Sequence, residues 1–274
     1  MQITTHTSPA TVRPNEDFVA AGPDWVMVLD GATPRPGVDS GCVHGPTWLV
    51  HQLAAAMARY LTIMTKPVLA DVLASAIDYT RINHEVYGCD LANPDSPSST
   101  VAMLRANRLD DTVDYLVLGD SPILLDLDGA LVRVEDLRSA QLPSYTAEAV
   151  RAARNQEGGF WVAAAVPAAA QYAVTGTVRA GDLQRAALLT DGMTRYVDRL
   201  RLGTWSDLLN DLADGAGMAD VVHRIRAAET RLLPELSTEP SGRIVKRHDD
   251  ATAALCLFET RRPAGQPDLG ARWG

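Results

Sequence analysis

Residues 25–31 read W-V-M-V-L-D-G, and this stretch decides how the rest of the chain is interpreted. Residues 26–29 form a short apolar run rich in β-branched side chains. Such a run is typical of a strand buried on both faces and is too short for most helices. It ends at Asp30 and Gly31. A carboxylate at the end of a buried strand is held rigidly, and a glycine after it allows its own carbonyl group to approach a ligand closely.

The same arrangement, an acidic residue at one end of an apolar strand, recurs three times. Residues 115–120 read Y-L-V-L-G-D, residues 186–192 read A-A-L-L-T-D-G, and residues 248–255 read H-D-D-A-T-A-A-L. Asp-Gly is also a common turn dipeptide, so any one of these sites alone could be a simple turn. Taken together, the strand-end aspartates predict one cluster of hard oxygen ligands, which favours Mg²⁺ or Mn²⁺ over zinc. The four residues are Asp30, Asp120, Asp191 and Asp249.

Composition limits the classes of function. The chain has 274 residues, of which 46% are hydrophobic and 22% charged, as expected for a globular protein with a substantial core. Its net charge of −9 argues against a nucleic-acid-binding surface. No apolar run approaches the roughly 20 residues of a membrane span, and the first residues lack the basic flank and apolar core of a signal peptide. We therefore expect a cytoplasmic protein that binds neither nucleic acid nor membranes.

The three cysteines, Cys42, Cys89 and Cys256, show neither C-x-x-C pairs nor zinc-finger spacing. On spacing alone, neither a disulfide scaffold nor a structural zinc site is indicated.

Hydrophobic periodicity predicts a mixture of strands and helices. Helices are expected at residues 46–61, 67–87, 204–212 and 218–233. Strands are expected at residues 2–7, 25–29, 100–105, 113–119, 123–126, 131–134, 172–178, 186–190 and 252–258, and Asp128-Gly129 signals a hairpin turn.

The order of these elements predicts an α+β fold in which helices grouped in pairs cover mostly antiparallel sheets. Strict βαβ alternation and a G-x-G-x-x-G motif are both absent, which disfavours a dinucleotide-binding fold. No linker interrupts the chain, so we expect a single domain over residues 1–260. Residues 261–274 are rich in proline and glycine and are expected to form a flexible tail.

The ordered motifs R-x-x-E-D, D-G, S-T, G-D-S, T-D-G and D-D-A-T, found between residues 13 and 252, resemble those of the metal-dependent protein phosphatases of the phosphatase-2C type, the PPM family. Each motif is short, but their order and spacing together are fairly specific. The resemblance implies a four-layer αββα fold with a centre that binds two or three Mg²⁺ or Mn²⁺ ions. It also implies hydrolysis of phosphoserine or phosphothreonine by a metal-bridging water.

The resemblance assigns roles to individual residues. Asp30 would bridge the two metals, the carbonyl of Gly31 would bind one of them, and Asp191 and Asp249 would complete the ligand set. Asp120 resembles the ligand of the third ion. Residues expected to support these ligands or the substrate are Glu16 and Asp17, which would hold metal-bound waters in the outer shell, Asp250, which would lie behind the ligands, and Arg13, which would clamp the substrate phosphate.

The loop after Gly31 departs from the family pattern. Ala32 stands where the family often has a histidine proposed as the general acid, and Ala32 cannot donate a proton. His44 is the nearest histidine in this loop, and either a role at the substrate or a surface position without a catalytic role is open to it. Arg35 is an extra cation that could contact a second anionic group of the substrate. The loop therefore leaves room for a small phosphorylated metabolite in place of a phosphorylated protein.

Two classes without catalysis compete with the phosphatase. A regulatory module could keep the fold without the activity, but loss of aspartates would be expected there and each one is present. A calcium-binding protein would need a D-x-[DN]-x-[DN]-G loop, which the sequence lacks. The sequence therefore favours an enzyme.

Overall fold

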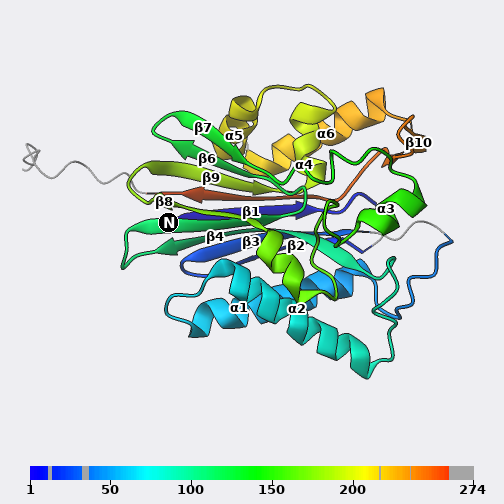
Figure 1. The fold of residues 1–274 in the computed structure, drawn as a ribbon. Helices are drawn as coiled ribbons and strands as arrows, with labels where there is room; N and C mark the ends of the chain where they lie inside the picture. The colour runs from blue at the N-terminus through cyan, green and yellow to red at the C-terminus, as the bar shows by residue number, and fades with distance from the viewer. Residues whose placement is uncertain (12–13, 33–36, 216, 235, 259–274) are drawn as a thin grey trace, which may run out of the picture.

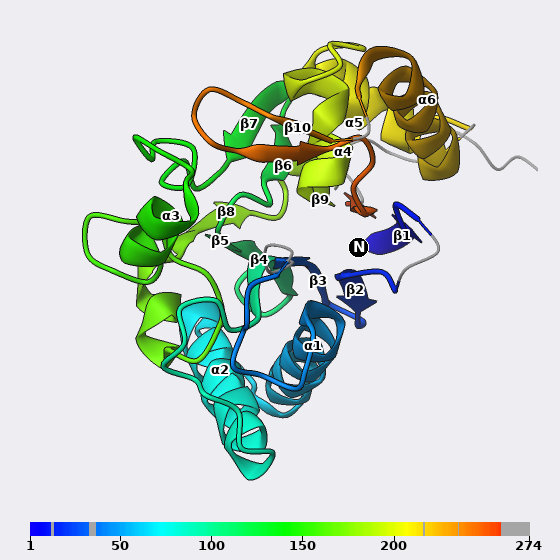
Figure 2. The same cartoon turned by 90° about the vertical axis from the view of Figure 1, so that its right-hand side faces the viewer.

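The structure is a computed structural model that describes residues 1–11, 14–32, 37–215, 217–234 and 236–258. Two five-stranded antiparallel sheets lie face to face, with helices outside them (Figure 1). One outer layer is α1 (Pro46–Ile63) and α2 (Leu69–Val86). The view turned by 90° shows the opposite outer layer, which contains α4 (Asp191–Asp198), α5 (Trp205–Ala213) and α6 (Gly217–Leu232) (Figure 2). The predicted four-layer αββα architecture is confirmed.

The first sheet contains the strand predicted at residues 25–29. Met27 and Leu29 pack in the hydrophobic cluster beneath α1 and α2, whereas Val26 and Val28 pack in the cluster between the two sheets. Both faces of this strand are buried, which explains why its apolar run is continuous. The strand order is β2 (Asp17–Ala21), β3 (Trp25–Ala32), β4 (Ser98–Asn107), β5 (Thr112–Leu118) and β8 (Val174–Arg179).

The second sheet places a strand from the beginning of the chain next to one from its end. Asp128 and Gly129 join two of its strands with φ angles of 51° and 85°. These left-handed values are those of a two-residue hairpin turn, so the predicted hairpin is confirmed. The strand order is β1 (Gln2–Ser8), β12 (Ala251–Leu257), β9 (Leu183–Leu189), β6 (Ile123–Leu127) and β7 (Ala130–Val134).

The long helices follow from local sequence. α1 begins at Pro46, where a missing backbone N–H costs nothing, and Leu49, Leu53 and Met57 on its apolar face are buried. α5 begins after a capping box in which Thr204 and Asp207 each accept the other's backbone N–H. The four predicted helices end within two residues of the observed bounds.

Several short elements were not predicted from the sequence. β2 reads D-F-V-A-A, in which polar and apolar side chains do not alternate, and α4 begins within a T-D-G that also fits a simple turn. No helix in the described part of the chain combines the length and apolar character needed to cross a membrane. The sequence of residues 136–158 is mixed but favours helix, and α3 (Ala147–Ala153) forms there. The elements without a prediction are the 3₁₀ helix η1 (Pro167–Tyr172), β10 (Leu236–Thr238) and β11 (Ile244–Lys246).

Candidate metal centre

Two of the acidic residues lie on neighbouring strands at one end of the first sheet. Asp17 begins β2 and is the direct cross-strand partner of Asp30, near the end of β3. Paired residues in an antiparallel sheet project their side chains to the same face. Asp17 is only 3% exposed, and Asp30 is half-buried. The pairing register therefore holds two carboxyl groups side by side in a partly desolvated place.

Asp191 reaches the same place from the second sheet. β9 ends at Leu189, and α4 begins two residues later at Asp191. The hydroxyl of Thr190 donates to Asp17 Oδ2 at 2.8 Å, and the backbone N–H of Asp191 lies 3.5 Å from Asp30 Oδ2. Polar contacts thus join the two sheets at the edge where their acidic residues meet.

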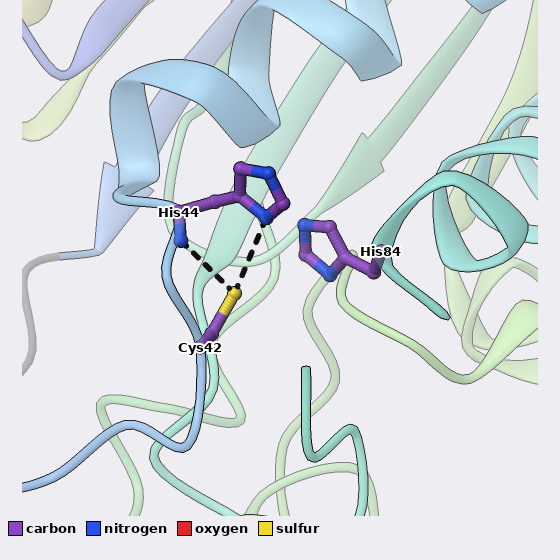
Figure 3. Close-up of side chains that lie close together, drawn as sticks. All are labelled: Cys42, His44 and His84. Atoms are coloured by element: carbon purple, nitrogen blue, oxygen red, sulfur yellow. Dashed lines mark hydrogen bonds between the residues drawn. The ribbon is translucent and has the colours of Figure 1, made fainter. Parts of the chain in front are cut away.

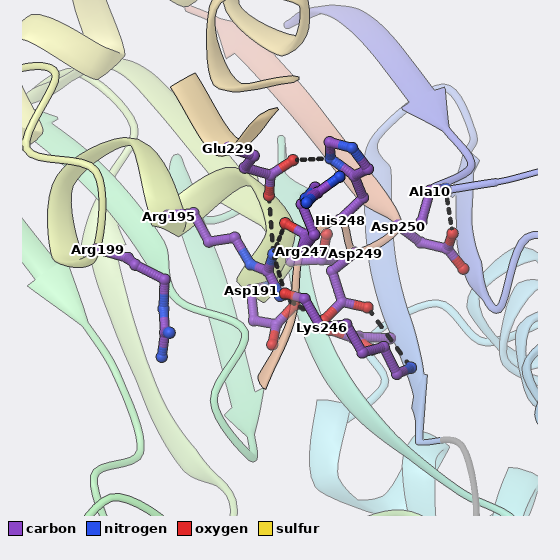
Figure 4. A network of polar contacts seen from close by, with 12 residues as sticks. Ala10, Asp191, Arg195, Arg199, Glu229, Lys246, Arg247, His248, Asp249 and Asp250 are labelled. Carbon is purple, nitrogen blue, oxygen red and sulfur yellow. Dashed lines mark hydrogen bonds and ion pairs between the residues drawn. The ribbon is translucent and has the colours of Figure 1, made fainter. Parts of the chain in front are cut away.

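Asp249 is oriented by an arginine of α4. Arg195 Nη2 donates to Asp249 Oδ2 at 2.7 Å, and Arg195 Nη1 donates to Glu229 Oε1 at 2.8 Å (Figure 4). Glu229 is fully buried, accepts a further bond from Arg226 at 2.9 Å, and lies 2.6 Å from His248 Nδ1. Because a buried carboxylate with three such partners is firmly placed, Glu229 fixes Arg195, which in turn orients Asp249.

Asp250 faces away from this group and holds Ala10 and Glu16. Its two carboxylate oxygens accept the backbone N–H groups of Ala10 and Glu16, at 2.6 and 2.7 Å. The Glu16 carbonyl accepts the N–H of Gly31 at 3.0 Å. A Cβ at Gly31 would lie 2.6 Å from that carbonyl oxygen, so only glycine fits here. Asp250 thus supports the strand end that carries Asp30.

Asp120 lies at the edge of a cavity beside the other aspartates. It is exposed and accepts a hydrogen bond from Ser139 Oγ at 3.3 Å. Asp120 and Asp191 both line this cavity of about 330 Å³, and a second cavity of about 150 Å³ is lined by Asp191 and Asp249. Arg243 contributes to both walls. The acidic group is therefore open to a small ligand.

The carboxyl groups raise one another's pKa values. Burial, together with the charges of Asp191 and Asp250, raises the pKa of Asp17 to about 8 against the hydrogen bonds from two threonines. Burial and the four surrounding aspartates raise the pKa of Asp30 well above its usual value. Burial and Asp249 raise the pKa of Asp191 to about 7, although Arg195 opposes this. Burial is the largest cause of the raised pKa in each case, and the like charges of the neighbouring carboxyl groups add to it.

A divalent cation would remove this repulsion, and the donor set suits one. Asp17, Asp30 and Asp191 form no ion pair with any lysine or arginine among the described residues. Carboxylate and carbonyl oxygens are the ligands that Mg²⁺ and Mn²⁺ prefer. The residues of this centre therefore fit the metals that the sequence predicted.

Comparison with known proteins shows which proteins share this fold. No family model matches the sequence, and no curated protein matches it either. Solved structures do match over nearly the whole chain. The Mycobacterium tuberculosis serine/threonine phosphatase PstP/Ppp is 17% identical, with a TM-score of 0.59 over 94% of this chain and 98% of that chain. The PPM Ser-Thr phosphatase MsPP from Mycobacterium smegmatis, in complex with cacodylate, is 14% identical, with a TM-score of 0.57 over 94% and 99%.

A third match is the catalytic domain of PstP in complex with two manganese ions, which is 18% identical, with a TM-score of 0.55 over 93% of this chain and 96% of that chain. The chain has the fold of the PPM-type serine/threonine phosphatases. The predicted resemblance is thereby confirmed for the fold. The acidic centre described above lies at one edge of the two sheets of this PPM fold.

Not every predicted site residue can be placed within the PPM fold. Asp17, Asp30, Asp191 and Asp249 come together, and Asp120 lies beside them on the cavity wall. Arg13 and Arg35 lie outside the described residues. Glu16 is positioned through its backbone N–H, which donates to Asp250 Oδ2.

His44 belongs to a different part of the fold. Its hydrogen-bond and ring contacts within the described chain are with Cys42, Cys89, Trp48, His84 and Tyr87. The structure therefore does not bring His44 to the aspartates.

Sequence reasoning missed the residues that orient Asp249. Arg195 follows Asp191 by four residues, so a helix starting at T-D-G would have placed both on one face. Glu229 continues the apolar stripe of Val222 and Ile225 along α6, and a carboxylate at such a position signals a buried charged partner. Neither signal identifies Asp249 as the partner, because that contact depends on how α4, α6 and the segment before β12 pack.

Proposed function

We propose that this chain is a Mg²⁺- or Mn²⁺-dependent phosphatase that hydrolyses phosphoserine or phosphothreonine in proteins. The observation that carries the proposal is the convergence of Asp30, Asp191 and Asp249 from both sheets at one edge of the PPM fold. The solved structures named above that share this fold are phosphatases, and one of them is in complex with two manganese ions.

The ligands follow from this arrangement. Asp30 and the Gly31 carbonyl, with Asp191 and Asp249, would hold two ions, and the exposed Asp120 would hold a third, weaker one. When bound, two divalent ions would lower the pKa of a water molecule and neutralise the charge of the transferring phosphoryl group. The proposal allows either Mg²⁺ or Mn²⁺ and either two or three ions.

The chain's own residues prepare this chemistry. The bond from Thr190 keeps the Asp17 carboxyl in place beside Asp30, where it can orient water. Arg195 holds Asp249 in a single orientation, so the ligand set is formed before any substrate arrives.

The larger cavity begins at Asp191 and is lined by Tyr145, Trp205 and Arg243, a wall that suits a phosphorylated side chain. Arg13 would contact the substrate phosphate, as the family resemblance implies. The phosphorylated protein partner and the cytoplasmic location stay predictions.

Hydrolysis of p-nitrophenyl phosphate and of a phosphothreonine peptide tests the proposal. We expect activity with Mn²⁺ or Mg²⁺ and none with EDTA. Losing an outer-shell partner of a metal ligand costs about 10- to 100-fold, so Asp191→Asn, which alters a ligand itself, should cost more. Asp110→Asn is the matched control, because Asp110 is an exposed aspartate paired with Lys66, and it should keep full activity.

Two outcomes would contradict the proposal. Activity that resists EDTA would exclude the metal centre. Equal activity of Asp191→Asn and the wild type would exclude the proposed ligand set. A panel of small phosphorylated metabolites, assayed alongside the peptide, decides between the two substrate classes: a much higher kcat/KM for one metabolite would replace the protein substrate.

A further inference from the structure

A second cluster of metal-binding side chains lies apart from the aspartates, between the loop before α1 and the end of α2. Cys42 and His44 come from the loop, and His84 comes from the last turn of α2 (Figure 3). The ligand atoms of these three residues lie within 4.8 Å of one another. Cys89, from the turn after α2, is the fourth member, because its Sγ lies 3.0 Å from Cys42 Sγ and 3.4 Å from His44 Nδ1.

One atom of this cluster is buried and lacks a partner. His84 is only 3% exposed, and its Nε2 has no hydrogen-bond partner among the residues that the structure describes. Leaving a buried polar atom unpaired costs about 1–3 kcal/mol, so native structures rarely retain one without a reason. A metal ion bound between the sulfur and nitrogen atoms would supply that partner.

We propose that Cys42, His44, His84 and Cys89 bind one zinc ion with tetrahedral geometry. Thiolate and imidazole are the ligands of structural zinc, with Zn–S near 2.3 Å and Zn–N about 2.0–2.1 Å. A tetrahedron with those bonds has sulfur–nitrogen edges of about 3.6 Å and a sulfur–sulfur edge of about 3.8 Å. The distances from His44 Nδ1 to the sulfurs of Cys42 and Cys89 are 3.6 and 3.4 Å and already match.

The sulfur–sulfur distance has to open by about 0.8 Å to reach the tetrahedral value. Cys89 is half-exposed and follows Gly88, so its side chain has room to adjust. The backbone N–H of His44 lies 3.3 Å from Cys42 Sγ and donates to it. Such a bond to sulfur stabilises a thiolate, which is the form that binds metal.

The zinc would join two loops that already contact each other. The N–H of Asp90 donates to the carbonyl of Gly41 at 2.7 Å, and Asn93 Nδ2 donates to the carbonyl of Asp39 at 3.0 Å. The ring of Trp48 stacks on His44 and on His84, with centroids 3.9 and 4.4 Å apart, and covers the imidazoles. The first of these loops leads directly into α1, so the ion would stabilise the segment before this helix.

Spacing did not reveal this site. The sequence contains C-x-H at residues 42–44 and H-x4-C at residues 84–89, which together differ from the zinc-finger pattern. The expectation that the cysteines form no zinc site therefore conflicts with this proposal. The site uses sulfur and nitrogen where the aspartate centre uses oxygen, so the two can be tested separately.

Titration of the full-length, reduced, zinc-free protein with Co²⁺ tests the proposal. Cobalt in this site would show intense tetrahedral d–d bands and a thiolate-to-cobalt charge-transfer band, neither of which an all-oxygen aspartate centre gives. We expect one equivalent of cobalt to saturate the charge-transfer band, and zinc to displace it. Metal analysis of the protein as purified should find one zinc per chain.

Three variants make the test specific. Cys42→Ser and Cys89→Ser should each lower the charge-transfer intensity and weaken cobalt binding at least 10-fold. Cys256→Ala is the matched control, because Cys256 is a cysteine of β12 outside the cluster, and it should leave both unchanged. Cys89→Ser alters a half-exposed residue, so it keeps the test valid if Cys42→Ser does not fold.

Several results would overturn the proposal. One is a reduced wild-type protein that gives no charge-transfer band. Another is a band of equal intensity in both cysteine variants. A third is a Cys42–Cys89 disulfide in the purified protein, with no cobalt bound after its reduction, since that would make the pair a redox couple and not a metal site.

Discussion

The acidic centre predicts that removing divalent cations makes stability fall as pH rises. In the metal-free folded state the pKa of Asp17 is about 8, whereas an aspartate in the unfolded chain has its usual value of 3.8. Between these values the folded protein holds a proton that the unfolded chain has released. Unfolding therefore releases a proton, and the free energy of unfolding decreases as pH increases. One such group contributes about 1.4 kcal/mol per pH unit.

The size of the effect follows from this slope. From pH 5 to pH 7, Asp17 alone would lower the free energy of unfolding by about 2.7 kcal/mol. For a chain of this size, 1 kcal/mol corresponds to about 2–4 °C in Tm, so Tm in EDTA should fall by about 5–10 °C. Asp191, whose pKa is raised to about 7, adds to the effect in the same direction. Mn²⁺ should remove the fall, because it favours the ionised carboxylates.

Differential scanning calorimetry at pH 5, 6, 7 and 8, with EDTA or Mn²⁺, measures this slope. Asp17→Asn removes the titrating group with little change in shape and should flatten the slope in EDTA. Asp110→Asn should not, because Asp110 is exposed and its pKa is lowered by Lys66, so it stays ionised over this range in both states. A Tm in EDTA that rises with pH, or the same slope in Asp17→Asn and the wild type, would refute the reasoning.

Three further changes are expected to have defined effects. Glu229→Gln should lower the free energy of unfolding by about 3–5 kcal/mol, because it removes the buried charge that pairs with both Arg195 and Arg226; chemical denaturation measures this, and a loss below 1 kcal/mol would contradict it. Gly31→Ala should abolish phosphatase activity and lower Tm, because its Cβ would lie 2.6 Å from the Glu16 carbonyl oxygen; a fully active variant would show that this strand end can move. Leu53→Ala should cost about 2–5 kcal/mol in urea denaturation, since Leu53 is fully buried beneath the first sheet, whereas the activity per folded molecule should stay unchanged.

Much of the fold was predictable because its signals are local. The apolar run at residues 26–29, the hairpin at Asp128-Gly129 and the apolar stripe of α1 each depend on neighbours a few residues away. The segments that were missed are short: β2 has five residues and α4 has eight. The residues of β2, D-F-V-A-A, do not alternate between polar and apolar side chains, and the eight residues of α4 make only about two helical turns, too few for a period of 3.6 to be recognised.

The same distinction between local signals and long-range contacts applies to the candidate sites. The sequence by itself determined that aspartates stand at the ends of apolar strands, because strand and turn preferences are properties of short segments. Only the tertiary structure decided which of them meet, since Asp17 and Asp191 are joined through Thr190 by the packing of two sheets.

Tertiary packing likewise brought Arg195 to Asp249. It also gathered the pair Cys42 and His44 with the pair His84 and Cys89, which lie some 40 residues later in the chain. Contacts between distant segments are selected by how buried faces fit together, and no pattern within one segment records that fit.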